Sequence, residues 1–395
     1  MCIVFVGPFG LQPKGTVSAR AVPIARALAR RGHSVAVVTP PWDNPQDSGK
    51  SLCLDGVPVV NIRLPLRLPL IWYLVVTFRL VRLALSASGG RPEAIHFFKP
   101  KAFSGLAMMA LWLTNKLRLT KLRLVVDSDD WEGKGGWNEL GSYSWVQRAF
   151  FAFQEKWVLS HADAVTVASK SLEERIGTFS SPQLIHYMPN GTSPLEDTGE
   201  PAAIRQRYGL VERPLVLLYT RFFEFRLERI AAIFRAVLAS TPEAVLLVVG
   251  RGLFGEEERL SILMEKEGLR DQIVLAGWVD RGRLGDYFAA ADVAIFPMDD
   301  TLINRAKCSA KLTELLCAGL PVVADAVGQN CEYIVDGETG LLVEPGNDEA
   351  FAAAVVRLLK NEGLRRRLGV GARERILRSY NWDCLTAGLE TVYWP

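Results

Sequence analysis

The sequence is poor in the residues from which metal sites and disulfide frameworks are built. Its 395 residues include four histidines and six cysteines, and the cysteines show no CxxC spacing and no neighbouring histidine cluster. Zinc sites and disulfide scaffolds need such groupings. We therefore expect reduced thiols in a cytoplasmic protein and no metal centre.

Long hydrophobic runs and a leader sequence are also missing. Residues 1–10 carry no basic leader and no cleavage site. The longest apolar run covers residues 68–78, whereas a helix that crosses a bilayer needs about 20 apolar residues. The sequence thus predicts no transmembrane segment, and at most peripheral attachment to the inner face of the cell membrane.

The glycine pattern of dinucleotide-binding domains is absent too. Neither strand-to-helix turn that opens an α/β series reads G-x-G-x-x-G, and no acidic residue stands at the ribose-binding distance. This argues against a dinucleotide-dependent oxidoreductase.

Charge is distributed unevenly along the chain. Residues 1–190 contain 22 Lys and Arg against 13 Asp and Glu, whereas the remainder contains 24 against 30. Between residues 60 and 125, eleven basic residues and one acid, Glu93, are interleaved with apolar residues. A basic, apolar surface suits anionic lipid headgroups. We do not expect nucleic acid as a partner, because aliphatic residues outnumber stacking aromatics here.

Apolar runs and amphipathic helices alternate along the chain in two series. The pattern predicts two doubly wound α/β domains with parallel sheets, at residues 1–190 and 214–378. A polar, Pro- and Gly-rich linker covers 191–213. Residues 379–395 form a tail in which we expect a single helix over 382–393.

One stretch, residues 307–346, combines a loop, a helix, a buried strand and a turn. Its start, KCSAKLTELLCAGLPVV, places Lys307 and Ser309 before the predicted helix and Lys311 in its first turn. Open amides and lysines at a helix start form an anion site. Glu314 is the only acid of this helix.

This stretch resembles the donor-nucleotide site of family-four glycosyltransferases, which are retaining enzymes of the GT-B fold. The family pattern has two Glu residues eight positions apart, followed by a small residue, Gly, any residue, Pro and apolar residues. Glu314 and residues 318–323 match its second half, as does the downstream DGETG turn. Ala306 stands where the family has the first Glu, which contacts the donor sugar. The departure suggests altered sugar recognition, in which Lys307 or Lys311 takes part.

The resemblance implies roles for several residues. Glu314 would accept hydrogen bonds from the donor ribose, and Ser309 with Lys307 would hold phosphate. Arg221 and Arg226 stand at the Arg and Lys positions that clamp the donor diphosphate, where fixed cations stabilise the leaving group. The alternatives are a helix-dipole acid and a pair of surface arginines.

Two further donor contacts are implied less directly. Gly15, in a Lys-Gly dipeptide, half matches the Gly-Gly of the first loop, with a plain helix cap as the alternative. Trp278 lies at the turn where the family holds the base, although packing explains a Trp after a strand equally well.

A second unusual segment, residues 127–137, reads DSDDWEGKGGW and ends a predicted strand. Strand ends carry functional loops in α/β folds, so Asp129 or Asp130 is a candidate to orient or deprotonate an acceptor hydroxyl. A structural turn with a glycine-rich lid is the alternative. Asp127 and Asp129 mimic the metal-binding DxD of the other major glycosyltransferase fold, but the two similar halves argue against that fold.

His96 and Lys99 lie at the end of an earlier predicted strand, 94–98. Lys99 is a candidate phosphate ligand. His96 is a candidate site residue, with a packed strand residue as the alternative.

Together these features predict a hexosyltransferase of the GT-B fold, with two Rossmann-like domains facing a cleft and a last helix that crosses back to the first domain. The donor is a nucleotide-diphosphate sugar, and no metal is required. The acceptor is a hydroxyl compound, lipid-linked or close to a membrane, in glycan or glycolipid assembly. A nucleotide-sugar epimerase or hydrolase of the same fold, or a non-catalytic nucleotide-sugar-binding subunit, remains the alternative.

Overall fold

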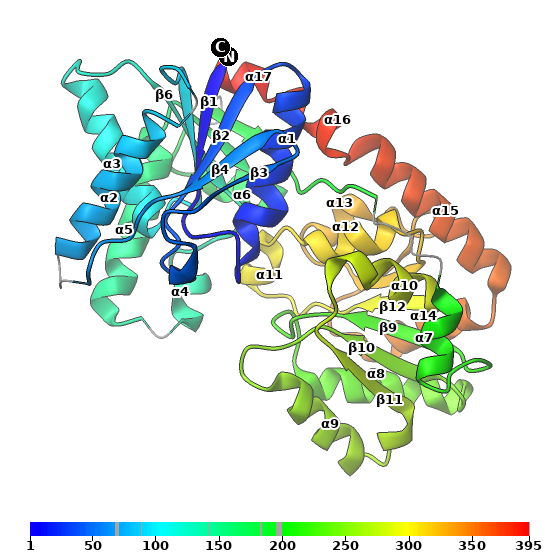
Figure 1. Cartoon of the computed structure of the whole chain (residues 1–395). Coiled ribbons are helices and arrows are strands. Elements are labelled where there is room, and N and C mark those ends of the chain that lie inside the picture. The colour runs from blue at the N-terminus through cyan, green and yellow to red at the C-terminus, as the bar shows by residue number, and fades with distance from the viewer. Residues whose placement is uncertain (68–70, 88, 142, 182–183, 195–199, 395) are drawn as a thin grey trace. The chain divides into compact units, whose positions relative to one another are not determined.

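The computed structural model describes residues 1–394 apart from 68–70, 88, 142, 182–183 and 195–199 (Figure 1). The chain forms two compact units. Unit 1 comprises Met1–Asn190, Ala306–Cys308 and Trp382–Pro395, and unit 2 comprises Gly191–Arg305 and Ser309–Asn381. The described part of the predicted linker, 191–213, belongs to unit 2, and so do residues 379–381 of the predicted tail.

Unit 1 is built on a sheet whose eight described strands have the order β3-β4-β2-β1-β5-β6-β7-β8. All neighbouring strands are parallel except the antiparallel pair β3 and β4. The central strands are almost entirely apolar because they are buried on both faces. The strands are β1 (Cys2–Val6), β2 (Ser34–Thr39), β3 (Ser51–Leu54), β4 (Val57–Asn61), β5 (Ala94–Phe98), β6 (Arg123–Ser128), β7 (Ala164–Val167) and β8 (Ile185–Tyr187).

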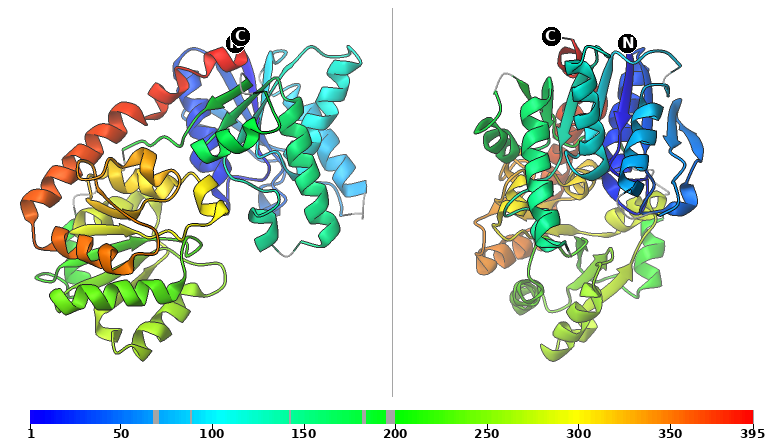
Figure 2. Two further views of the ribbon diagram at one scale, coloured as in Figure 1. Left: turned by 180° about the vertical axis from the view of Figure 1, so that it is seen from behind. Right: turned by 90° about the vertical axis from the view of Figure 1, so that its left-hand side faces the viewer.

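Helices cover both faces of this sheet. On one face α2 packs on α3 and α3 packs on α5, whereas α1 packs on α16 at the other face (Figure 1, Figure 2). Right-handed crossovers require this division, because β1 connects to β2 in one direction and β4 to β5 in the other. The helices are α1 (Val22–Arg30), preceded by a π-helical turn (Val17–Ala21), α2 (Ile71–Ala84), α3 (Ala102–Lys116), α4 (Trp137–Leu140), α5 (Trp145–His161), α6 (Lys170–Gly177), α16 (Trp382–Thr386) and α17 (Glu390–Tyr393).

Unit 2 contains a second parallel sheet, which among the described residues has the order β11-β10-β9-β12-β13-β14. Its core lies between this sheet and helices α8, α9 and α14. The strands are β9 (Leu215–Tyr219), β10 (Val245–Val249), β11 (Ile273–Gly277), β12 (Val293–Phe296), β13 (Val322–Asp325) and β14 (Leu341–Val343). The helices are α7 (Pro201–Arg207), α8 (Leu227–Ser240), α9 (Glu256–Lys266), α10 (Leu284–Ala290), α11 (Leu302–Ala306), α12 (Ala310–Cys317), α13 (Asn330–Tyr333), α14 (Asp348–Leu359) and α15 (Glu362–Ser379).

The structure confirms the predicted fold class, with two α/β units and parallel sheets. The single helix expected over 382–393 was wrong: α16 ends at Thr386 and α17 begins at Glu390, with Gly388 between them. Glycine weakens a helix interior, which explains the break. The short strands β3 and β8 were not predicted. Part of the apolar run 68–78 lies outside the described residues.

No helix in the described part of the chain is long and apolar enough to cross a membrane.

Candidate functional site

In unit 2, the candidate donor residues lie near the edge where the parallel strands end. The carboxyl ends of β9, β10, β11 and β12 meet at one edge because these strands are parallel. The loop after β10 approaches the end of β9 so closely that a Cβ on Gly250 would lie 1.8 Å from the Thr220 carbonyl oxygen. Only glycine fits there, so the loop after β10 can lie directly against the end of β9.

Glu314 is a buried carboxylate on α12, with 8% of its surface exposed. The Tyr219 hydroxyl donates to its Oε2 at 3.3 Å, and an Arg281 guanidinium nitrogen lies 3.2 Å from its Oε1. Burial raises the pKa of Glu314, while Arg281 and Lys311 oppose the rise. Glu314 is thus held in place by residues from β9 and from the loop after β11.

Two buried polar groups near α12 and β9 lack a partner within the described part of the chain. Neither the Ser309 hydroxyl nor the Nε of Arg221 makes a hydrogen bond, and Ser309, at the N-cap of α12, does not cap the helix. Unpartnered buried polar groups are costly, so such groups indicate a ligand or water that would satisfy them. Phe222, directly after Arg221, has φ +65°, a value that bulky residues seldom adopt outside functional loops.

Of the remaining unit 2 candidates, Arg226 and Trp278 are exposed and Lys311 is half-buried. Arg226 has an 81% exposed side chain that lies 3.7 Å from the Asp299 carboxylate. Trp278 is 64% exposed and follows Gly277, which has φ +70°. The Lys311 ammonium lies 5.9 Å from the centre of the Tyr219 ring. Among these three, only Lys311 is brought close to a residue that contacts Glu314.

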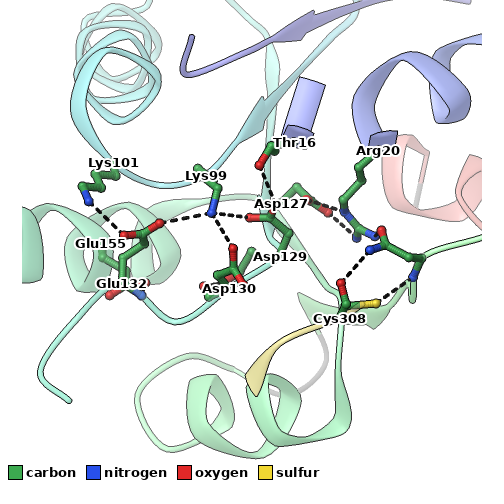
Figure 3. A network of polar contacts seen from close by, with 12 residues as sticks. Thr16, Arg20, Lys99, Lys101, Asp127, Asp129, Asp130, Glu132, Glu155 and Cys308 are labelled. Carbon is green, nitrogen blue, oxygen red and sulfur yellow. Dashed lines mark hydrogen bonds and ion pairs between the residues drawn. The ribbon is translucent and has the colours of Figure 1, made fainter. Parts of the chain in front are cut away.

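In unit 1, the segment after β6 forms a network of buried charges around Lys99 (Figure 3). The Lys99 ammonium lies 3.1 Å from Asp129, 2.8 Å from Asp130 and 3.1 Å from Glu132. Burial alone would lower the pKa of Lys99, but the three carboxylates hold it well above its usual range. Lys99, a candidate phosphate ligand, therefore has its charge neutralised within the protein.

The carboxylates of this network differ from one another. Asp130 has the most exposed side chain of the three around Lys99, at 21% against 11% for Asp129 and 6% for Glu132. Burial and the charge of Asp129 raise the pKa of Asp130, although Lys99 opposes the rise. Burial would raise the pKa of Glu132 as well, but Lys99 and Lys101 lower it. Asp130 is thus the best placed of the three to meet a substrate.

Glu155, on α5, contacts the backbone of this network. Its Oε1 accepts a hydrogen bond from the Glu132 amide at 3.0 Å, and burial raises the pKa of Glu155 to about 8. A Cβ on Gly133 would lie 2.7 Å from its Oε2, so the chain passes directly over this carboxyl group. The sequence offers one signal: Glu155 is the only acid in α5.

Arg20 links the start of unit 1 to the same region. It forms two hydrogen bonds of 2.7 Å to Asp127 and one of 3.0 Å to Asn190, whose side chain donates to the Cys308 carbonyl at 2.9 Å (Figure 3). Thr16 donates to Asp129 at 2.9 Å. The loop before α1 is thereby joined to the end of β6, and Gly15 lies next to that contact with open space around it.

Two more positions named from the sequence lie in unit 1. The side chain of Ala306 is buried, and its carbonyl accepts a hydrogen bond from Ser169 at 2.8 Å. The Lys307 ammonium lies 6.0 Å from the centre of the Trp137 ring. Lys307 therefore belongs to unit 1, whereas Ser309, Lys311 and Glu314 belong to unit 2.

His96 is a packed residue of β5. Its Nδ1 lies 2.8 Å from the Tyr393 hydroxyl and its Nε2 lies 3.1 Å from Thr166. Burial and the charge of Arg20 lower its pKa to about 3, so the ring is neutral. With no exposed surface, His96 connects the tail of the chain to the sheet and does not reach solvent.

Sequence reasoning missed Arg20, Tyr219, Glu155 and Arg281. Each acts through a partner distant in the sequence. The sequence gave a signal only for Tyr219, which ends a predicted strand, and for Glu155, the one acid of its helix. In the described residues, no group of three or more His, Cys, Asp or Glu side chains is arranged to hold a metal ion.

Known proteins resemble the chain over nearly its whole length. Residues 202–375 match the family model of the group 1 glycosyl transferases, and residues 15–191 match that of the glycosyl transferase 4-like domain. A D-inositol 3-phosphate glycosyltransferase of Xylanimonas cellulosilytica is 31% identical over 60% of this chain, a stretch that spans 58% of that relative. A GDP-mannose-dependent alpha-(1-6)-phosphatidylinositol monomannoside mannosyltransferase of Mycobacterium tuberculosis is 26% identical over 93% of this chain and 91% of its own.

Solved structures share the fold. Sucrose-phosphate synthase from Thermosynechococcus elongatus has a TM-score of 0.73 at 23% identity and covers 100% of this chain and 98% of its own. HepE from Anabaena, in complex with UDP and glucose, has a TM-score of 0.73 at 15% identity and covers 99% of both chains. Because the two family models together match residues 15–191 and 202–375, the chain belongs to the group 1 glycosyltransferases, and it is an enzyme with the GT-B fold.

Proposed function

We propose that the enzyme transfers a sugar from a nucleoside-diphosphate sugar to a hydroxyl group of an acceptor, with retention of the anomeric configuration. The observation that carries the proposal is the group of unsatisfied polar atoms in unit 2: Ser309 at the start of α12 and Arg221 after β9. Helix amides, a hydroxyl and a guanidinium are the groups that bind phosphate. The relatives named above include enzymes that use nucleotide sugars, which agrees with this donor class.

In this mechanism unit 2 binds the donor. Glu314 accepts hydrogen bonds from the ribose hydroxyls, a position for which Tyr219 and Arg281 hold its carboxylate ready. Arg221 and the first amides of α12 bind the diphosphate. These cations and dipoles matter most as the glycosidic bond breaks, because the departing diphosphate gains negative charge. No metal is needed for that step.

Unit 1 supplies the acceptor side in the same mechanism. Asp130 orients the acceptor hydroxyl, and Lys99 fixes the position of Asp130. The acceptor oxygen forms its bond to the anomeric carbon on the face from which the diphosphate leaves, and the hydroxyl proton passes to a departing phosphate oxygen. The enzyme works at a membrane surface in glycan or glycolipid assembly, on a lipid-linked acceptor.

Thermal denaturation with nucleoside diphosphates tests the donor site. A diphosphate at about 100 times its dissociation constant should stabilise the protein by about 2.7 kcal/mol. Glu314→Ala should remove the shift, whereas Glu338→Ala, at an exposed acid of the same unit, should leave it unchanged. If UDP, GDP and ADP all fail to shift the melting temperature, the donor assignment is wrong.

Turnover tests the reaction itself. Release of the diphosphate from a nucleotide sugar should depend on an added acceptor, and NMR of the product should show the anomeric configuration of the donor. An inverted product would contradict retention, and release without an acceptor would indicate a hydrolase.

A further inference from the structure

Unit 1 exposes an unusual amount of apolar surface. More than half of the large apolar side chains that are exposed in the described part of the chain fall within residues 66–153. Soluble monomers seldom leave extended apolar patches open to water, and such patches usually mark an interaction surface. The apolar surface of unit 1 is therefore a candidate interaction surface.

The exposed side chains follow two helices of the same layer. On α2, Ile71, Leu74 and Phe78 are 56%, 73% and 65% exposed, and their spacing of three and four residues places them on one face. On α5, Val146 and Phe150 are 54% and 41% exposed, four residues apart. We call these two rows the outer stripes.

The outer stripes lie at the same end of the layer. Helices that connect parallel strands run antiparallel to the strands, so α2 and α5 both begin at the edge where the strands end. Each stripe begins in the first turn of its helix. Because α2 packs on α3 and α3 packs on α5, the three helices form one layer with α3 in the middle (Figure 2).

Packing within the unit does not need these residues. The opposite face of α2, with Val76, Leu80 and Ala84, is fully or almost fully buried. An ordinary surface helix pairs such a face with a polar one. Here the second face is apolar as well, so α2 has an apolar side for the core and another for a partner.

The exposed charges on helices α2, α3 and α5 have one sign. Helices α2 and α3 contain no Asp or Glu, and the single acid of α5, Glu155, is buried. The nearby Arg79, Arg82 and Arg148 are basic. A second copy of the chain docked on this face would bring like charges together, whereas an anionic bilayer offers negative headgroups and an apolar interior.

We propose that the outer stripes of α2 and α5 insert into the headgroup region of an anionic membrane, with the arginines beside them contacting lipid phosphates. The inference deepens the proposed function by naming the surface that meets the membrane. It does not depend on the donor site, because every residue involved belongs to unit 1.

Co-sedimentation of the full-length protein with vesicles tests the proposal. The protein should bind phosphatidylcholine vesicles that contain phosphatidylglycerol, bind pure phosphatidylcholine weakly, and lose binding as salt is raised. Leu74→Glu with Phe150→Glu should weaken binding at least about tenfold, since each removes an inserted apolar group. Leu253→Glu with Phe254→Glu, at equally exposed positions of unit 2, should leave binding unchanged.

The outcomes separate the alternatives. Equal binding to neutral and anionic vesicles, or an unchanged Leu74→Glu, Phe150→Glu variant, would overturn the proposal. A variant that changes the oligomeric state in light scattering but not vesicle binding would show that the stripes form an interface between copies. A nucleoside diphosphate should still shift the melting temperature of every variant, which keeps failure of the membrane surface distinct from failure of the donor site.

Discussion

The polar groups around Lys99 in unit 1 and those around α12 in unit 2 are satisfied in different ways. Around Lys99 in unit 1, the ammonium is neutralised by carboxylates of the same loop. Around α12 in unit 2, Ser309 and Arg221 keep buried polar atoms without a partner in the described chain. The Lys99 ammonium is thus paired within the chain, whereas Ser309 and Arg221 leave polar atoms for a ligand to satisfy.

This difference suggests that the Lys99 network mainly stabilises the fold and that the α12 site mainly binds a ligand. A buried ion network fixes the position of its members and makes their removal costly. An unsatisfied site costs folding energy that a bound ligand returns. Variants in unit 1 should therefore change stability first, and variants in the donor site of unit 2 should change binding first.

The largest effect should come from Lys99→Ala. It leaves Asp129, Asp130 and Glu132 buried without their shared cation, so we expect a loss of about 3 to 5 kcal/mol in the free energy of unfolding at neutral pH. Urea denaturation measures this. Lys134→Ala, at an exposed lysine of the same loop, is the control. A loss below about 1 kcal/mol would show that the network is dispensable.

Glu155→Gln should change the pH dependence of stability. Because burial raises the pKa of Glu155 to about 8 from 4.5, the folded state keeps its proton after the unfolded state has lost it. The stabilisation is complete below about pH 4.5 and is lost as pH rises toward 8, with a limiting slope of about 1.4 kcal/mol per pH unit. The glutamine cannot ionise and lacks this loss.

Denaturation of both proteins at pH 5.5, 7 and 8.5 tests that prediction. The stability of Glu155→Gln relative to the original protein should rise with pH, by a few kcal/mol in total. A difference that does not vary with pH would mean that Glu155 is ionised in the folded protein.

The fold could be predicted because parallel strands leave a strong signal. Residues 2–6 and 245–249 are unbroken apolar runs and 94–98 is apolar apart from His96, and all three became buried strands. The strands that sequence reasoning missed, β3 and β8, are short edge strands without fully buried residues. An edge strand depends on one neighbour, so its own pattern carries little information.

The candidate site could be predicted only where a local sequence pattern marks its residues. Ser309 and Glu314 share one helix start, and their motif identified them. The partners of Glu314 come from β9 and the loop after β11, and Arg20 meets Asp127, which lies 107 residues later in the sequence. Residues that are distant in sequence come together in these pairs because the strand order of each sheet places the elements that carry them side by side. The same applies to Lys99, whose sequence gives no indication that three carboxylates surround it.

On the unit 2 side, Glu314→Gln should weaken diphosphate binding more than it weakens the fold. Hydrogen bonds to a charged group contribute about 1.5 to 3 kcal/mol, so we expect about ten- to a hundredfold lower affinity for a nucleoside diphosphate. Calorimetric titration measures this, with Glu338→Gln as the control. An unchanged affinity would refute the contact between Glu314 and the ribose.

The smallest change in stability should come from Arg226→Ala. Its guanidinium is largely exposed and lies 3.7 Å from Asp299, while its backbone amide donates to Asp299 at 3.1 Å and would continue to do so in the variant. Exposed ion pairs contribute little, so the free energy of unfolding should change by less than about 0.5 kcal/mol. If Arg226 clamps the diphosphate, the variant should bind it less tightly at low salt and the difference should shrink as salt is raised. A markedly less stable variant would show that Arg226 stabilises the fold, as Lys99 does. The loop after β9 would then resemble the Lys99 network rather than a ligand site.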